Sequence, residues 1–274
     1  MEEITAELVS DHLVEHVPLR VRPRVTIGAK TDIGRIRDNN EDKFEFFVPE
    51  GEQEVAAKGL AFVVADGMGG HEAGQIASEI AVKTFLETYY SYPGSEPEAA
   101  LRAAVNGANR FVVDVGRAIP SRRGMGSTLS VLVLLQDVGY IAQVGDSRVY
   151  RFRRGVTELL TVDHTWVEQM VLHGSLSREE AESHPNRHML LRAIGSETDF
   201  EPDIYLFQLE QQDVFMICSD GVTNHVPDAK INEILASAGP SEAARQLVTA
   251  ALVGGGSDNA TVLVIRVDEL ESAD

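Results

Sequence analysis

Aspartates stand at the ends of short apolar runs in this chain, and each is followed by a residue that favours a turn. Asp66, Asp146 and Asp220 follow aliphatic or β-branched stretches that are typical of buried strands, and Asp258 precedes such a stretch. Carboxylates gathered where strands surface repel one another, and a bound divalent cation relieves that repulsion. The pattern therefore predicts strands whose ends meet at a metal site.

The composition indicates one sizeable globular domain. The chain has 274 residues, of which 43% are hydrophobic. Its apolar runs, such as 131–135, are far shorter than the roughly 20 residues that cross a bilayer, and no cationic leader with an apolar core opens the sequence. The single cysteine, Cys218, agrees with a reducing compartment. We expect a cytoplasmic protein with no membrane partner.

The charge of the chain bears on its partners. Asp and Glu number 43 against 24 Lys and Arg, which gives a formal net charge of −19. Most of such a surface repels polyanions. Nucleic acid is therefore not expected as a partner.

Apolar periodicity predicts strands and paired helices in alternating blocks. Strands are predicted at 25–30, 43–48, 60–65, 128–135, 138–145, 148–153, 204–209, 213–218 and 260–267. Helices are predicted at 72–90, 96–117, 228–238 and 241–253. The close succession of strands between 128 and 153 predicts an antiparallel meander. In the segment 163–195, histidines and arginines interrupt two short helical patterns, which indicates an excursion from the core.

Several short motifs occur in an order that is typical of one enzyme family. They are Gly34-x-x-Arg37-x-x-Asn40-Glu41-Asp42, Asp66-Gly67-Met68-Gly69-Gly70-His71, Gly126-Ser127-Thr128, Gly145-Asp146-Ser147-Arg148, Asp163-His164, Ser219-Asp220-Gly221 and Asp258-Asn259-x-Thr261. With these motifs the chain resembles the metal-dependent protein serine/threonine phosphatases, the protein phosphatase 2C or PPM family, in its bacterial form. The motifs span residues 25–267.

The resemblance implies an α+β fold. It is a four-layer αββα sandwich of two antiparallel sheets flanked by helix pairs, with the metal site at one end. The catalytic domain would cover 25–267, with a flap at about 163–195 beside the cleft. Residues 1–24, acidic and broken by prolines, would form an N-terminal arm, either dispensable or used for docking. Residues 268–274 would be a C-terminal tail.

The same resemblance implies roles for the carboxylates. Asp66 would bridge two metal ions, and Asp220 and Asp258 would complete the first ion's ligands. Glu41 and the backbone carbonyl of Gly67 would bind the second ion.

Further roles follow from the resemblance. Asp42 would hold metal-bound water, and Asp146 with Asp220 would bind a weaker third ion. Gly-Asp-Ser-Arg could also be a plain hairpin turn, so the role of Asp146 has a structural alternative.

Phosphate ester hydrolysis by two metal ions requires these residue types independently of the resemblance. Two divalent ions about 3.5–4 Å apart acidify a bridging water and offset charge on phosphoryl oxygens. Oxygen ligands suit Mn²⁺ or Mg²⁺, and no histidine or cysteine stands among them. A glycine at 67 lets a backbone carbonyl approach an ion closely. Arg37 could grip two phosphate oxygens bidentately, as Lys cannot, although it could instead be a structural ion-pair partner.

The proton donor departs from many eukaryotic relatives, in which a histidine follows the Asp-Gly pair. Here that position is Met68, and a thioether cannot donate a proton. His71 could substitute, but metal-bound water is the preferred donor. Cys218 is not expected to be a nucleophile, because no phosphate-cradling loop ending in arginine follows it. We expect it in the core.

The predicted function is hydrolysis of phosphoserine and phosphothreonine in proteins by water that a binuclear metal centre activates, with no phosphoenzyme. The expected partners are phosphorylated proteins, including serine/threonine kinases that a monomeric enzyme would oppose in bacterial signalling. A pseudo-phosphatase or regulatory binding module of the same fold is the main alternative, and loss of any metal-ligating aspartate would have favoured it. A nuclease is a second alternative, against which the charge of −19 argues.

Overall fold

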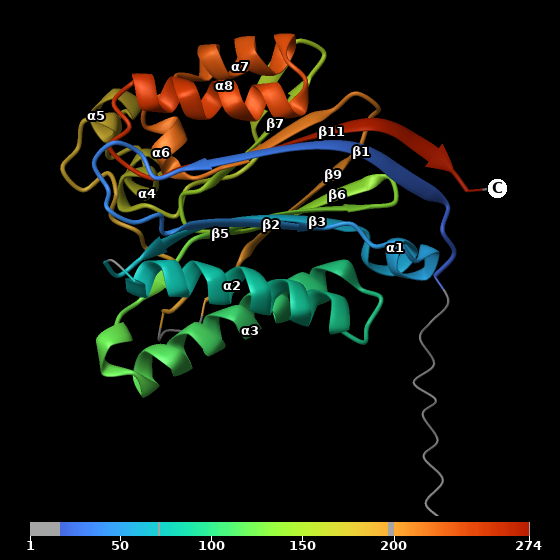
Figure 1. Ribbon diagram of the computed structural model, residues 1–274, viewed down its shortest axis with the longest axis horizontal. Coiled ribbons are helices and arrows are strands. Elements are labelled where there is room, and N and C mark those ends of the chain that lie inside the picture. Colours follow the sequence, from blue (N-terminus) through green and yellow to red (C-terminus); the bar gives the residue numbers. More distant parts are fainter. Residues whose placement is uncertain (1–16, 71, 197–199, 274) are drawn as a thin grey trace, which may run out of the picture.

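Two antiparallel sheets packed face to face form the centre of the molecule (Figure 1). The computed structural model describes residues 17–70, 72–196 and 200–273. One sheet has the order β1-β11-β10-β7-β8 and the other β2-β3-β5-β6-β9, with β4 paired to β3. The strands are β1 (Val21–Asp32), β2 (Asp42–Phe47), β3 (Leu60–Met68), β4 (Gly126–Ser127), β5 (Leu129–Leu135), β6 (Val138–Val144), β7 (Arg148–Arg153), β8 (Val156–Leu159), β9 (Asp203–Gln208), β10 (Val214–Cys218) and β11 (Ala260–Ser272).

Helix pairs cover the outer faces of both sheets (Figure 1). The α2–α3 pair packs on the sheet that contains β3, and the α7–α8 pair packs on the sheet that contains β11. The helices are α1 (Glu52–Lys58), α2 (Glu72–Ser91), α3 (Pro97–Ala118), the short 3₁₀ helix η1 (Pro120–Arg122), α4 (Trp166–Leu172), α5 (Arg178–Glu182), α6 (Asp220–Thr223), α7 (Asp228–Ser237) and α8 (Pro240–Val253). The predicted four-layer sandwich is confirmed.

Strand β3 shows why the apolar runs are nearly continuous in the sequence. Ala61, Val63 and Ala65 face the helices α2 and α3. Phe62 and Val64, which point the other way, pack between the two sheets. Because successive side chains alternate across a strand and both faces are covered here, every position of β3 has to be apolar until the strand reaches the site at Asp66.

The folded body begins earlier and ends later than the predicted boundaries at 24/25 and 267/268. Strand β1 begins at Val21, and its first residues pair with the end of β11, Val21 opposite Ser272. The buried amide of Gln136 accepts hydrogen bonds from the backbone N–H groups of Arg20 and Val21 at 2.8 and 3.1 Å. Both predicted boundaries therefore fall inside paired strands. Residues 1–16 of the predicted arm lie outside the described residues.

The segment 163–195 leaves the sandwich between β8 and β9 and carries α4 and α5. It lies at the same end of the molecule as α6, opposite the end that holds α1 (Figure 1). Isolated β-bridges, Thr165 to Leu190 and Ser127 to Ile194, close its base. We call residues 163–195 the flap. Within the described residues, no helix combines the length and the apolarity that a bilayer span requires.

Candidate metal centre

The predicted carboxylates come together where strands of both sheets reach one end of the sandwich. Asp42 opens β2 and pairs in register with Asp66, near the end of β3. Asp146 lies in the turn between β6 and β7, Asp220 opens α6 directly after β10, and Asp258 precedes β11. The site thus bridges the two sheets, which explains why its residues are far apart in the sequence.

Mutual repulsion marks these carboxylates as one cluster. Burial raises the pKa of Asp66 well above its ordinary range, and the charges of Asp42, Asp220, Asp146 and Asp258 raise it further. Burial likewise raises the pKa of Asp146, with Asp220 as the next contributor. Asp66, Asp146, Asp220 and Asp258 still keep partial exposure toward the cleft. Such a site either takes up protons or binds a cation.

Unpartnered oxygens test whether the residues fit a metal. Among the described residues, the buried side-chain atoms without a hydrogen-bond partner are Asp42 Oδ1, Asp220 Oδ1 and Arg151 Nε. Two of these three atoms are carboxylate oxygens of this cluster. A buried polar atom without a partner is costly, so native folds rarely keep one without a ligand or water. Hard carboxylate oxygens in this state fit Mn²⁺ or Mg²⁺.

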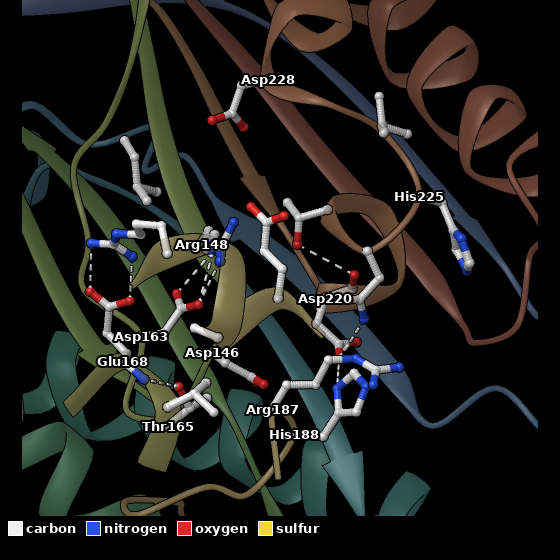
Figure 2. Close-up of a pocket in the computed structure, with 18 of the residues that line it drawn as sticks. Asp146, Arg148, Asp163, Thr165, Glu168, Arg187, His188, Asp220, His225 and Asp228 are labelled. Carbon is white, nitrogen blue, oxygen red and sulfur yellow. Dashed lines mark hydrogen bonds and ion pairs between the residues drawn. The ribbon is translucent and has the colours of Figure 1, made fainter. Parts of the chain in front are cut away.

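Basic side chains contact two of the carboxylates. Arg37 Nη2 bonds Asp258 Oδ2 at 2.7 Å, and His188 Nδ1 lies 3.6 Å from Asp220 Oδ2. Figure 2 shows the His188 ring turned toward Asp220, with Asp146 nearby. In the described part of the chain, no three His, Cys, Asp or Glu side chains are arranged to hold an ion as they stand. The carboxylates are gathered, but Asp258 and Asp220 are oriented toward Arg37 and His188.

The pKa values of Asp220 and Asp42 are shifted in opposite directions. Burial pushes the pKa of Asp220 upward, but His188 and Asn224 outweigh it, and the pKa is lowered. Burial raises the pKa of Asp42 to about 7, against the hydrogen bond that Ser219 Oγ donates to Asp42 Oδ2 at 2.7 Å. Asp220 is therefore the more readily ionised of the two.

Packing explains the two glycines on either side of Glu41. A Cβ on Gly67 would lie 2.1 Å from the carbonyl oxygen of Gly74, and a Cβ on Gly74 would lie 1.8 Å from Glu41 Oε2. Gly67 is thus needed for the close approach of α2 to β3. Asn259 fixes the other side of Glu41, since its Oδ1 accepts from the Glu41 backbone N–H at 2.8 Å. Sequence reasoning did not single out Gly74.

The Gly-Ser-Thr motif connects two of the aspartates. The backbone N–H of Asp66 donates to Thr128 Oγ1 at 2.8 Å, and the Thr128 N–H donates to the Asp66 carbonyl at 2.8 Å. Thr128 Oγ1 also lies 2.7 Å from Ser147 Oγ, next to Asp146. The backbones that carry Asp66 and Asp146 are therefore joined through one threonine.

A cleft of about 1050 Å³ opens beside the carboxylates. Asp146, Asp220 and Asp258 line one side of it, and Arg178 and Arg187 of the flap line another. This is room for an extended ligand next to the cluster.

Comparison with known proteins agrees with this geometry. Residues 37–252 match the family model described as protein phosphatase 2C. The chain is 38% identical over 244 residues to the serine/threonine phosphatase stp of Listeria monocytogenes, an alignment that covers 87% of this chain and 94% of that protein. The chain belongs to the protein phosphatase 2C family.

Solved structures of other phosphatases share the fold. The crystal structure of the Mycobacterium tuberculosis serine/threonine phosphatase PstP/Ppp has a TM-score of 0.79 at 33% identity and covers 89% of this chain and 99% of that one. A structure of the catalytic domain of PstP in complex with two manganese ions has a TM-score of 0.77 at 32% identity, with the same coverage. Our chain is thus a metal-dependent protein serine/threonine phosphatase of the bacterial PPM type, and the alternatives of a binding module and a nuclease are set aside.

Other side chains of the phosphatase have structural roles. The arginines that follow Asp146 are paired with carboxylates. They are Arg148 with Asp163, Arg151 with Glu158, Arg153 with Glu210 and Asp213, and Arg154 with Glu210. Cys218 is buried, and burial raises the pKa of its thiol to about 12, so the phosphatase keeps it as an unreactive core residue. His71 lies outside the described residues.

The flap supplies a residue to the phosphatase site that sequence reasoning missed. His188 lies in the flap outside its helices, beside Asp220 (Figure 2). No motif or periodicity marks it, because a histidine in an irregular segment gives no local pattern.

Proposed function

We propose that the phosphatase hydrolyses phosphoserine and phosphothreonine in proteins at this cluster, with Asp66, Asp220, Asp258, Glu41 and Gly67 holding two Mn²⁺ or Mg²⁺ ions. The observation that carries the proposal is the buried meeting of carboxylates from both sheets, two of whose oxygens lack a protein partner. The two manganese ions of the related PstP catalytic domain support it. When bound, the ions supply an acidified water and positive charge opposite the phosphoryl oxygens.

Asp42 is proposed to orient a water molecule. Its Oδ2 accepts from Ser219 Oγ, which fixes the carboxyl group, while its Oδ1 has no protein partner. A fixed carboxylate with one free oxygen can accept a hydrogen bond from water and hold that water in one orientation. This is the role we assign to Asp42, with no covalent phosphoenzyme.

Arg37 is the proposed phosphate anchor. Its side chain is 51% exposed at the rim of the cluster, within reach of ligands, and it is paired with Asp258. An oxygen of Asp258 that ligates an ion no longer accepts from Arg37. The guanidinium can then direct parallel N–H donors to phosphate oxygens.

Asp146, together with Asp220, is proposed to hold a weaker third ion. Both carboxylates line the cleft. The charges of both raise the pKa of Asp66, and the charge of Asp220 also raises the pKa of Asp146. The flap beside them is proposed to select protein substrates, among them serine/threonine kinases. The expectation of a cytoplasmic monomer stays a prediction.

Phosphate release from a phosphothreonine peptide tests the proposed function. We expect release with Mn²⁺ or Mg²⁺ and none with a chelator. Release that persists in the chelator would contradict a metal-dependent mechanism. Release with metal from a free aryl phosphate but from no phosphopeptide would contradict the protein substrate.

A further inference from the structure

His164, at the base of the flap, is buried, and both of its ring nitrogens are bonded. The backbone N–H of Gly145 donates to His164 Nδ1 at 3.2 Å, and Nε2 lies 3.1 Å from Asp203 Oδ2. Since Nδ1 accepts a hydrogen bond, it carries no proton, and the ring hydrogen lies on Nε2, which donates to Asp203. The surroundings thus select one tautomer of a neutral imidazole.

The backbone of His164 holds the peptide unit on the other side of Gly145, which joins Gly145 to Asp146. Its N–H donates to the Gly145 carbonyl at 2.9 Å, so one residue bonds both polar groups of Gly145. Gly145 has φ +101°, and a Cβ there would lie 2.6 Å from Thr128 Cγ2. Only glycine fits this position without strain. The next residue along the chain is Asp146.

On the other side of Asp146, the backbone is fixed by the sandwich itself. The Ser147 carbonyl accepts from Ser130 Oγ at 2.9 Å and from Gln143 Nε2 at 2.6 Å. Asp146 therefore lies between a residue held by strands β5 and β6 and a residue whose N–H is held by His164.

His164 also connects this turn to the far end of the flap. The N–H of Leu191 donates to the His164 carbonyl at 2.8 Å. Arg192 Nη1 bonds Asp203 Oδ1 at 2.6 Å, on the carboxylate that accepts from His164. Burial and the charge of Arg192 lower the pKa of His164, which agrees with a neutral ring. A continuous series of bonds thus runs from the flap to the turn that carries Asp146.

We propose that His164 is a positioning residue for the phosphatase reaction: it holds Gly145, the residue before Asp146, on both sides and links Gly145 to the flap through Asp203. The inference rests on the role in catalysis proposed above for Asp146. Displacements of about 1 Å in a site can cost about 100-fold in rate. Loss of a contact that fixes the residue before Asp146 is therefore expected to lower kcat strongly.

Paired substitutions separate the two sides of the ring. His164→Asn keeps an acceptor at the position of Nδ1, facing Gly145, and His164→Gln keeps a donor at the position of Nε2, facing Asp203. We expect His164→Gln to lose about 10- to 100-fold in kcat with little change in KM, and His164→Asn to stay within about threefold of wild type. The exposed flap residue His173, changed to Asn, is the matched control.

A second readout reports the anchor directly. Amide hydrogen exchange at Gly145 should accelerate in His164→Gln and stay near wild type in His164→Asn and His173→Asn. The concentration of Mn²⁺ for half-maximal activity should rise in His164→Gln. Equal effects of the Asn and Gln substitutions on kcat and on Gly145 exchange would overturn the proposal.

Two further variants make every outcome decisive. If the His164 variants fail to fold, Asp203→Ala, at a side chain 34% exposed, should still lower kcat several-fold and speed Gly145 exchange. Without Asp203 the ring hydrogen of His164 is no longer fixed on Nε2, so Nδ1 is no longer a dedicated acceptor, a loss that an asparagine at 164, which has no tautomers, does not share. Unchanged values for both would refute the link. Asp146→Ala is the reference: full activity there would refute the role of Asp146, whereas an inactive Asp146→Ala beside a fully active His164→Gln would refute the positioning inference alone.

Discussion

Asp42→Asn in metal-free protein tests the electrostatics of the cluster. Burial raises the pKa of Asp42 from 3.8 to about 7. A difference of about 3 pH units corresponds to about 4 kcal/mol, at about 1.4 kcal/mol for each unit. Asparagine keeps the shape and still accepts from Ser219, and it exchanges one unpartnered buried oxygen for one unpartnered amide group. The change therefore removes the titration of Asp42 and, with its charge, part of the repulsion that raises the pKa of Asp66.

The sign of the stability change follows from the raised pKa of Asp42. Because the folded chain binds this proton more tightly than the unfolded chain does, its contribution to stability is fully present below about pH 4 and is lost as the pH rises through about 7. An asparagine side chain at this position has no such proton to lose, so the metal-free variant should exceed the wild type in stability at pH 8 by about 4 kcal/mol. This corresponds to roughly 10 °C in Tm for a chain of this size.

Thermal unfolding followed by circular dichroism in a chelator, from pH 5 to pH 8, measures the effect. The curves of Tm against pH should diverge as the pH rises, with the wild type falling more steeply than Asp42→Asn, in which Asp66 and Asp146 still titrate. Asp114→Asn, at an exposed position on α3, is the control and should follow the wild type. Parallel curves for the wild type and Asp42→Asn would refute the argument that Asp42 is destabilised by burial. Saturating Mn²⁺ should raise the wild-type Tm, while Asp42→Asn should hydrolyse phosphopeptide poorly.

Four further outcomes are expected. Asp66→Asn should stay folded by circular dichroism, lose nearly all phosphate release and show no Tm rise with Mn²⁺, whereas the wild type should gain about 2.7 kcal/mol at 100 times the Kd; activity above a few per cent would count against a shared ligand. Arg37→Ala should raise KM for a phosphothreonine peptide about tenfold or more, with Arg35→Ala on the same exposed loop as control, and an unchanged kcat/KM would remove Arg37 from phosphate binding. Asp146→Ala should lose more turnover on the peptide than on p-nitrophenyl phosphate, because an alkoxide leaves less readily than a phenolate; small, equal losses would leave Asp146 a turn residue. Replacing 163–195 by a short linker should alter protein substrates more than p-nitrophenyl phosphate, and equal losses would make the flap part of the core.

The sequence predicted most of the sandwich because its strands are covered on both faces. In β3 the apolar run ends where the strand reaches Asp66, so composition alone marks both the strand and the site. The start of β1 was placed too late, because residues 21–24 alternate arginine with apolar residues and pair with a segment about 250 residues away. Local pattern carries no information on that pairing.

Within the site, the residue types predicted a cluster of carboxylates, and the fold brings Asp146, Asp220 and Asp258 close enough to raise the pKa of Asp66. The pairings of Asp258 with Arg37 and of Asp220 with His188 could not be predicted, since they depend on how loops from separate elements meet. The reason for Gly67 also differs from the sequence argument. Its missing side chain admits helix α2, a tertiary contact that the sequence does not encode locally.

The position of β11 has a consequence for the order in which a ribosome makes the enzyme. This strand lies between β1 and β10, and the loop before it carries Asp258 and Asn259, which hold Arg37 and the backbone of Glu41. A nascent chain that stops before Asp258 leaves β1 without its partner and the carboxylate cluster without one member. The sandwich and the carboxylate cluster are thus completed by the same stretch of chain, so we expect no phosphatase activity on the ribosome before β11 has been made.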